Sequence, residues 1–102
     1  DQINSMKPQG ISIYYTNTTL YQDNNNKIKE KFFIDYEEKF NEKPNYFAAF
    51  AFDLLNIIQD GLENNKSDVR EYILEKEFHG VMNNIKFDKS GDAIFPMIIE
   101  KL

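Results

Sequence analysis

Apolar residues recur at helical spacing between residues 27 and 40. They are Ile28, Phe32, Phe33, Tyr36 and Phe40. Steps of one, three and four residues place these side chains along one face of a helix, and charged residues fill the other side. Pro44 follows, and a proline disfavours helix in the residue before it. The pattern therefore predicts a surface helix over residues 27–40.

The next apolar stretch, from Tyr46 to Leu62, has almost no polar side. A helix that is apolar all round has to be buried from more than one direction. We therefore predict a second helix over residues 46–62, with Phe50, Leu54 and Ile58 buried.

The remaining segments predict one more helix and three strands. Ser67 is a suitable N-cap for a short helix over 68–76, and β-rich or alternating runs predict strands near 11–15, 84–88 and 94–101. Pro96 restricts the last strand to an edge or a bulge. The predicted order is β-α-α-α-β-β, which is an α/β chain. It offers the helix over 46–58 too few partners for an α/β layer, so we expect a piece of a larger protein.

Composition limits the possible functions. The 102 residues suffice for one domain, carry a formal charge of −5 and include no cysteine. The acidic balance argues against nucleic-acid binding, because phosphate neutralisation needs a basic stripe. No apolar run is long enough to cross a membrane. Residue 1 is Asp rather than Met, and we expect the chain to begin after processing or to be cut from a longer one.

No catalytic or metal-binding pattern emerges. His79 is the only histidine, and we interpret it as a loop residue. Adjacent Glu37 and Glu38 point about 100° apart on a helix and cannot share a site. The run from Asp88 to Asp92 lacks the glycine and glutamate positions of a calcium loop, which favours a hairpin turn. We therefore expect a protein that is not an enzyme and needs no cofactor or metal.

Recognition is the remaining chemistry. Tyr46 and Phe47 begin the apolar helix, where free N–H groups and the positive end of the helix dipole suit a carboxylate. Their rings could cover the apolar part of a ligand. The alternative is that both rings are core residues.

Two blocks of the sequence resemble a known family. The first block, from Phe32 to Asp53, reads Phe32-x-x-x-Tyr36-x-x-Lys39-Phe40-x-x-x-Pro44-x-x-x-Ala48-Ala49-x-Ala51-Phe52-Asp53. The second reads Phe78-x-Gly80-Val81, then Ile85-x-Phe87-Asp88-x-x-Gly91-Asp92. Both resemble the type I periplasmic binding proteins, and more narrowly the branched-chain amino acid solute-binding proteins of ABC transporters. Asn41, Phe52 and Asn83-Asn84 depart from the family pattern.

The resemblance implies the C-terminal portion of a two-lobe fold about three times longer. Residues 1–26 would form a lead-in, a strand and a crossover loop of the second lobe. Residues 27–78 would form the helical part of the first lobe, and residues 79–102 a crossover and C-terminal β-hairpin of the second. The family's ligand-stacking aromatic falls on Phe47, with Tyr46 beside it and Tyr15 as a weaker candidate. Asp53 falls on a position that we interpret as structural.

The resemblance also implies a function. We expect the substrate-binding component of a bacterial uptake system, with an amino acid as ligand, an ABC permease as partner, and a periplasmic or cell-surface lipoprotein location. The alternatives are a ligand-sensing receptor domain of the same fold and a free-standing small interaction protein. We further expect the 102-residue chain to self-associate, because nothing in it covers the helix over 46–58 and large exposed apolar patches tend to become interfaces.

Overall fold

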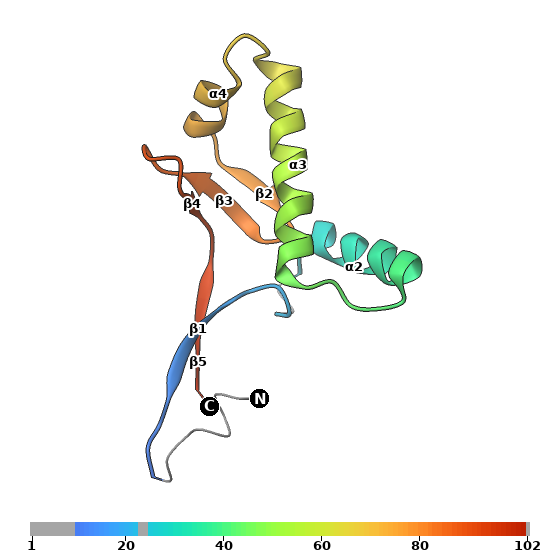
Figure 1. Ribbon diagram of the computed structural model, residues 1–102, viewed down its shortest axis with the longest axis vertical. Coiled ribbons are helices and arrows are strands. Elements are labelled where there is room, and N and C mark those ends of the chain that lie inside the picture. Colours follow the sequence, from blue (N-terminus) through green and yellow to red (C-terminus); the bar gives the residue numbers. More distant parts are fainter. Residues whose placement is uncertain (1–9, 23–24, 102) are drawn as a thin grey trace.

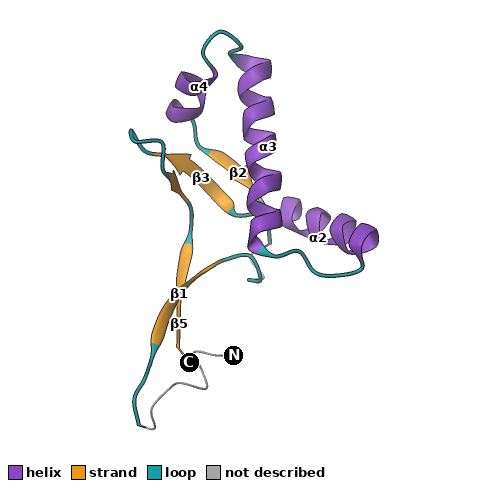
Figure 2. Cartoon of the chain, in the orientation of Figure 1, coloured by secondary structure: helices purple, strands orange, loops and turns teal. Residues whose placement is uncertain are grey.

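The computed structural model describes residues 10–22 and 25–101, with three helices and five strands in this part of the chain (Figures 1 and 2). In chain order these are β1 (Tyr14–Thr18), α2 (Lys27–Phe40), α3 (Tyr46–Asn64), α4 (Val69–Glu75), β2 (Phe78–Gly80), β3 (Asn83–Phe87), β4 (Ala93–Ile94) and β5 (Met97–Lys101).

Helix α2 has the predicted bounds. The side chain of Asn26 accepts a hydrogen bond from the Lys29 N–H and caps its first turn, and Asn41 ends it with the left-handed φ of 56° that asparagine tolerates. Phe32 is buried, and its ring lies 4.7 Å from that of Phe52 on α3. The middle of α2 therefore contacts α3 through this ring pair, while Ile28 and Phe40 of the same stripe are exposed.

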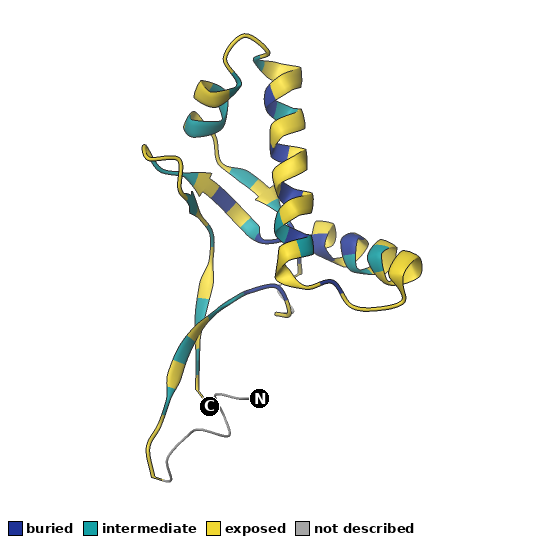
Figure 3. Cartoon of the chain, in the orientation of Figure 1, coloured by how far each residue is buried: buried dark blue, intermediate teal, exposed yellow. Residues whose placement is uncertain are grey.

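Helix α3 is two residues longer than predicted, and its buried face is a different one. Ala49, Asp53, Ile57 and Gly61 are its buried residues. The prediction that Phe50, Leu54 and Ile58 are buried is wrong for this chain, because Leu54 and Ile58 are each 39% exposed and Phe50 is half-buried. The cause is that other elements cover only one stripe of the helix, formed by the four buried residues, which are spaced four positions apart (Figure 3).

Helix α4 and a small antiparallel sheet, in the order β2-β3-β4, lie beside α3. A Cβ at Gly61 would lie 2.8 Å from the Val69 side chain, so the glycine allows α4 to approach closely. Strand β2 was not predicted as a strand: His79 lies in it rather than in a loop. The predicted strand over 94–101 is two strands, β4 and β5, separated at Phe95 and Pro96 because a proline removes a ladder donor.

Strands β1 and β5 form a separate two-stranded antiparallel ribbon, which extends away from the helices (Figure 1). β1 lies three residues later than the predicted 11–15, because its register is set by β5: Tyr14 pairs with Lys101 and Thr18 with Met97. The described residues before Tyr14 lie outside this ladder.

The chain is extended, and its core is small. The radius of gyration is 16.8 Å, against about 13 Å for a compact domain of this length. Leu20, Val81, Met82 and Ile85 are at most 1% exposed, so the best-packed region lies where the segment after β1 meets the turn between β2 and β3. Among the described residues, no helix is long and apolar enough to cross a membrane.

Candidate functional site

The first turn of α3 presents the predicted ligand-contacting side chains. Asn45 caps the helix, and its side-chain oxygen accepts a hydrogen bond of 2.9 Å from the Ala48 N–H. No acidic residue lies in the first turn, so no carboxylate of that turn offsets the positive end of the helix dipole. Tyr21 donates from its hydroxyl to the Pro44 carbonyl at 2.8 Å, which anchors the chain just before the helix.

The rings of Tyr46 and Phe47 are stacked, with centroids 4.2 Å apart and planes 29° apart. Tyr46 is 46% and Phe47 68% exposed. Within this chain neither ring is therefore a core residue, and the pair forms an apolar surface beside the helix N-terminus. This arrangement can contact the apolar part of a small molecule whose negative group lies at the end of α3.

Tyr15, the third predicted residue, lies on the ribbon rather than on α3. Its hydroxyl donates to the carboxylate of Glu100, the residue opposite in the ladder with β5. This hydrogen bond raises the pKa of Tyr15, because loss of the proton would leave two negative groups in contact. The structure thus brings Tyr46 and Phe47 together and holds Tyr15 on a different element.

Asp53 is the best-buried carboxylate of the described chain, with 3% exposure. Its two oxygens accept hydrogen bonds from the N–H groups of Val81 at 2.8 Å and Met82 at 2.9 Å. A Cβ at Gly80 would collide with the carboxylate of Asp53, so only glycine fits at that position. Asp53 therefore fastens the turn between β2 and β3 to α3, as expected of a structural residue.

The environment of Asp53 has opposing effects on its titration. Burial raises the pKa of Asp53, while the two backbone N–H bonds and the nearby His79 act in the opposite direction. Burial is the larger effect, since removing a carboxylate from water disfavours its charged form.

Two asparagines extend this contact to the segment that follows β1. Asn26 donates from its amide to the Gly80 carbonyl at 2.8 Å and to the Asn83 side-chain oxygen at 2.9 Å. Asn83 in turn donates to the Thr19 hydroxyl at 2.7 Å. We call these residues the polar joint: Thr19, Asn26, Asp53, Gly80 and Asn83. Sequence reasoning noted Asp53, Gly80 and Asn83 separately but missed that the five residues meet, because the hydrogen bonds of the joint connect residues up to 64 positions apart.

Lys29 supports the same segment from α2. It is 7% exposed, and its ammonium donates to the carbonyls of Thr19 at 2.8 Å and Gln22 at 2.9 Å. The segment after β1 is therefore held by α2 as well as by the turn between β2 and β3.

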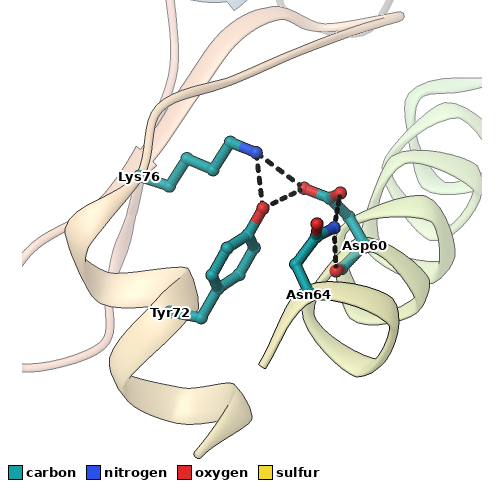
Figure 4. A network of polar contacts seen from close by, with 4 residues as sticks. All are labelled: Asp60, Asn64, Tyr72 and Lys76. Carbon is teal, nitrogen blue, oxygen red and sulfur yellow. Dashed lines mark hydrogen bonds and ion pairs between the residues drawn. The ribbon is translucent and has the colours of Figure 1, made fainter. Parts of the chain in front are cut away.

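A second polar network, shown in Figure 4, joins α3 to α4. Tyr72 donates to the Asp60 carboxylate at 3.2 Å, Lys76 lies 3.1 Å from the same carboxylate, and Asn64 donates to the Asp60 side chain at 2.8 Å. These contacts raise the pKa of Lys76, chiefly through its hydrogen bond with Tyr72. A cavity of about 400 Å³ adjoins Asp60 and Lys76, but these two side chains are already paired with each other.

Two other side chains considered for chemistry, those of His79 and Asp88, have structural partners. His79 is exposed, and its Nδ1 lies 2.9 Å from the Asn84 side-chain oxygen. Asp88 accepts from the N–H groups of Ser90 and Asp92, each at 2.9 Å, as in a tight turn between β3 and β4. Within residues 10–22 and 25–101, no cluster of three or more potential ligands is placed to hold a metal ion.

Comparison with solved structures gives the fold. A leucine-binding protein, LivK, from Thermotoga maritima superposes with a TM-score of 0.67 at 22% identity, covering 89% of this chain. A solute-binding protein of an ABC transporter from R. palustris, solved in complex with benzoate, superposes with a TM-score of 0.66 at 16% identity, covering 97%. The fold is that of part of a type I periplasmic binding protein.

The likeness to type I periplasmic binding proteins confirms the predicted partial α/β fold. The chain spans 27% of the leucine-binding protein and 29% of the benzoate-bound protein. No protein-family profile matches the chain, and no curated protein sequence does.

Proposed function

We propose that this chain is part of a non-enzymatic solute-binding protein that serves an ABC-type uptake system. The fold shared with two solute-binding proteins is the observation that carries the proposal. Both neighbours are binding proteins by name, and the polar clusters described above are structural. An extracytoplasmic location, periplasmic or as a cell-surface lipoprotein, and a permease partner follow from this function.

The domain assignment is part of the same proposal. The β1–β5 ribbon would belong to the second lobe, together with the rest of residues 1–26 and 79–102, of which residues 1–9, 23–24 and 102 lie outside the described part of the chain. Residues 27–78 would belong to the first lobe. In Figure 1 the ribbon lies apart from the helices, which supports its assignment to the second lobe. Residues 79–94 instead lie against α3 and α4, where Asp53 holds the turn after β2 and β3 contacts α4, and this packing does not support that part of the division.

The proposed ligand is a small carboxylate with an apolar part, such as a branched-chain amino acid. Leucine and benzoate, named for the two neighbours, share this chemistry. The N-terminus of α3 would face the carboxylate, and the exposed rings of Tyr46 and Phe47 would cover the apolar part. Tyr15, on the ribbon, would face the crossover region between the two lobes and is the weaker candidate for a ligand contact.

Calorimetry with leucine, isoleucine, valine and benzoate tests the proposal. The 102-residue chain should bind none of them measurably, because most of the length of the neighbouring proteins is absent. In a complete protein that includes the remaining length, Phe47→Ala should weaken binding by about 1–3 kcal/mol, the usual scale for an aromatic contact. Ile34→Ala, at an exposed position of α2, is the matched control and should leave the affinity unchanged.

Two outcomes would contradict the proposal. A tight stoichiometric complex of the 102-residue chain would show that the ligand site is complete without the remaining length. An affinity unaffected by Phe47→Ala would remove the assigned role of α3. A ligand-sensing receptor domain remains the alternative of the same fold, and a failure of the complete protein to support uptake, despite binding, would favour it. A reading frame that extends well upstream of Asp1 would eliminate the other alternative, a free-standing small interaction protein.

A further inference from the structure

We propose that Asn83 is a positioning residue, which fixes the orientation of the β1–β5 ribbon relative to the aromatic end of α3. Any effect of this ribbon orientation on how a ligand is enclosed rests on the function proposed above. The geometric claim itself concerns only the described chain and is argued from the polar joint.

The side chain of Asn83 makes two hydrogen bonds, one with Thr19 and one with Asn26. Its amide donates to the Thr19 hydroxyl at 2.7 Å, and its carbonyl oxygen accepts from the Asn26 amide at 2.9 Å. Thr19 directly follows the last residue of β1, and Asn26 caps α2. One side chain, at the first residue of β3, therefore holds both the end of the ribbon and the start of a helix.

The backbone supports this placement of Asn83. Its φ of 67° is left-handed, a conformation that asparagine adopts more readily than most residues. The turn just before it is fixed to α3 by Asp53, through the N–H groups of Val81 and Met82. The side chain is thus directed at Thr19 by a turn that is itself immobilised on the helix.

Helix α3 continues the connection to the candidate site. Asp53 lies six residues after Phe47, which at 1.5 Å per residue is about 9 Å along the helix. A continuous set of contacts therefore runs from the end of β1, through Thr19, Asn83 and Asp53, to the helix turn that carries Tyr46 and Phe47.

The other contacts at this end of the ribbon hold the backbone after β1: Lys29 binds the carbonyls of Thr19 and Gln22, and Leu20 is buried. Among the described strands, β1 and β5 pair only with each other. On the β5 side the connection to β4 is Phe95-Pro96, where the ladder is interrupted, and the ring of Phe95 lies 5.4 Å from that of Phe50 on α3. Removing the Asn83 side chain should therefore widen the range of ribbon orientations.

Distance measurement between two spin labels tests this directly. The chain has no cysteine, so Thr16→Cys on β1 and Glu63→Cys on α3, both at exposed positions, give one defined label pair. Asn83→Gly removes the side chain and keeps the left-handed backbone accessible. Lys29 still holds the carbonyls of Thr19 and Gln22 in this variant, so the segment stays attached. All measurements are made without ligand and at a dilution chosen so that light scattering gives the mass of a monomer.

The parent should give one narrow distance distribution, and Asn83→Gly should give a broader one with a shifted maximum. Asn84→Ala is the matched control, since Asn84 is the neighbouring asparagine and contacts the exposed His79 instead. Its distribution should equal that of the parent. A residue with only a stabilising role would lower the melting temperature and leave the distribution of the folded chain unchanged.

Thr19→Val removes the same hydrogen bond from the other side while keeping the size of the side chain. Thr19→Val should broaden the distance distribution in the same way. It takes the place of Asn83→Gly in the test if circular dichroism shows that Asn83→Gly has lost its helices. An unchanged distribution in either folded variant overturns the proposal, and so does an equal broadening in Asn84→Ala. Because no ligand is present, these results are independent of whether the proposed function is correct.

Discussion

The two sides of α3 differ in what covers them. On one side Ala49, Asp53, Ile57 and Gly61 are buried, and both oxygens of the one charged residue among them are paired. On the other side, apolar side chains are open to solvent: Phe47 is 68%, Leu55 69% and Leu62 50% exposed. One face of this helix is thus covered by other residues of the chain (the completed face), and the other is left exposed (the open face). Only the completed face is specified by polar contacts.

The largest expected effect is at the contact between Gly80 and Asp53. Gly80→Ala places a methyl group against the buried carboxylate and should lower the free energy of unfolding by about 3 kcal/mol, since two backbone N–H groups lose their partner. The same substitution in an Asp53→Ala background should cost much less, because the clash is gone. Urea unfolding of the four chains measures this difference. Equal costs in the two backgrounds would show that the two positions are independent.

The completed face should also respond to pH. Because burial raises the pKa of Asp53 above its unfolded value, the folded chain binds this proton more tightly than the unfolded chain. The Asp53 contribution therefore favours folding at pH below the unfolded value and is lost as pH rises through the folded pKa. The Asp53→Asn variant has no titrating group at this position, so the stability of the parent relative to the variant should fall over this window. Thermal melts across the acidic range would record it, and a constant difference would contradict the direction of the shift.

The open face should cause self-association of the 102-residue chain. Leu55→Glu places a charge in the most exposed apolar position of α3 and should weaken the association by about tenfold, which corresponds to about 1.4 kcal/mol. Glu63→Gln on the same helix is a control that should not reduce association. Light scattering over a concentration series gives the molar mass. A clean monomer of the parent at high concentration would mean that this face needs no cover.

The smallest expected effect is at the N-terminus of α3, which the two faces share. Asn45→Ala removes the cap of the first turn and should cost about 1 kcal/mol of unfolding free energy. Asn45→Ser should restore most of it, because serine is also a good N-cap. Denaturant unfolding compares the two variants. Equal stability of Asn45→Ala and the parent would show that packing of Pro44 alone fixes this end.

Local patterns predicted the helices to within two residues at each end, although Asp68 rather than the predicted Ser67 caps α4. Long-range contacts explain the other errors. Helix α2 begins and ends where its capping residue and apolar spacing indicate. The register of β1 depends on β5, which lies at the other end of the chain, so a preference for β structure at Ile11–Ile13 placed the strand too early. The buried face of α3 is set by Gly80 and the turn after it, and nothing in the apolar pattern distinguishes Asp53 from a surface charge.

The aromatic pair of the candidate site could be identified from its position at a helix start, whereas the polar joint could not. Tyr46 and Phe47 are adjacent in sequence, and their exposure follows from the first turn of α3. Asn26 and Asn83 lie far apart and are common residue types in this chain. Only the folded structure shows that their amides meet.

The pairing of the first and last described strands has a consequence for the order of folding. Tyr15 and Glu100 are 85 positions apart, whereas α3 and α4 are joined by contacts that span 12 to 16 positions. Closing a long loop costs more chain entropy than closing a short one, so contacts close in sequence should form earlier. The α3–α4 hairpin can assemble as soon as both helices leave the ribosome, but the ribbon cannot form until Met97–Lys101 has been synthesised. A nascent chain stalled before Met97 would therefore have an ordered helical hairpin and an unpaired β1.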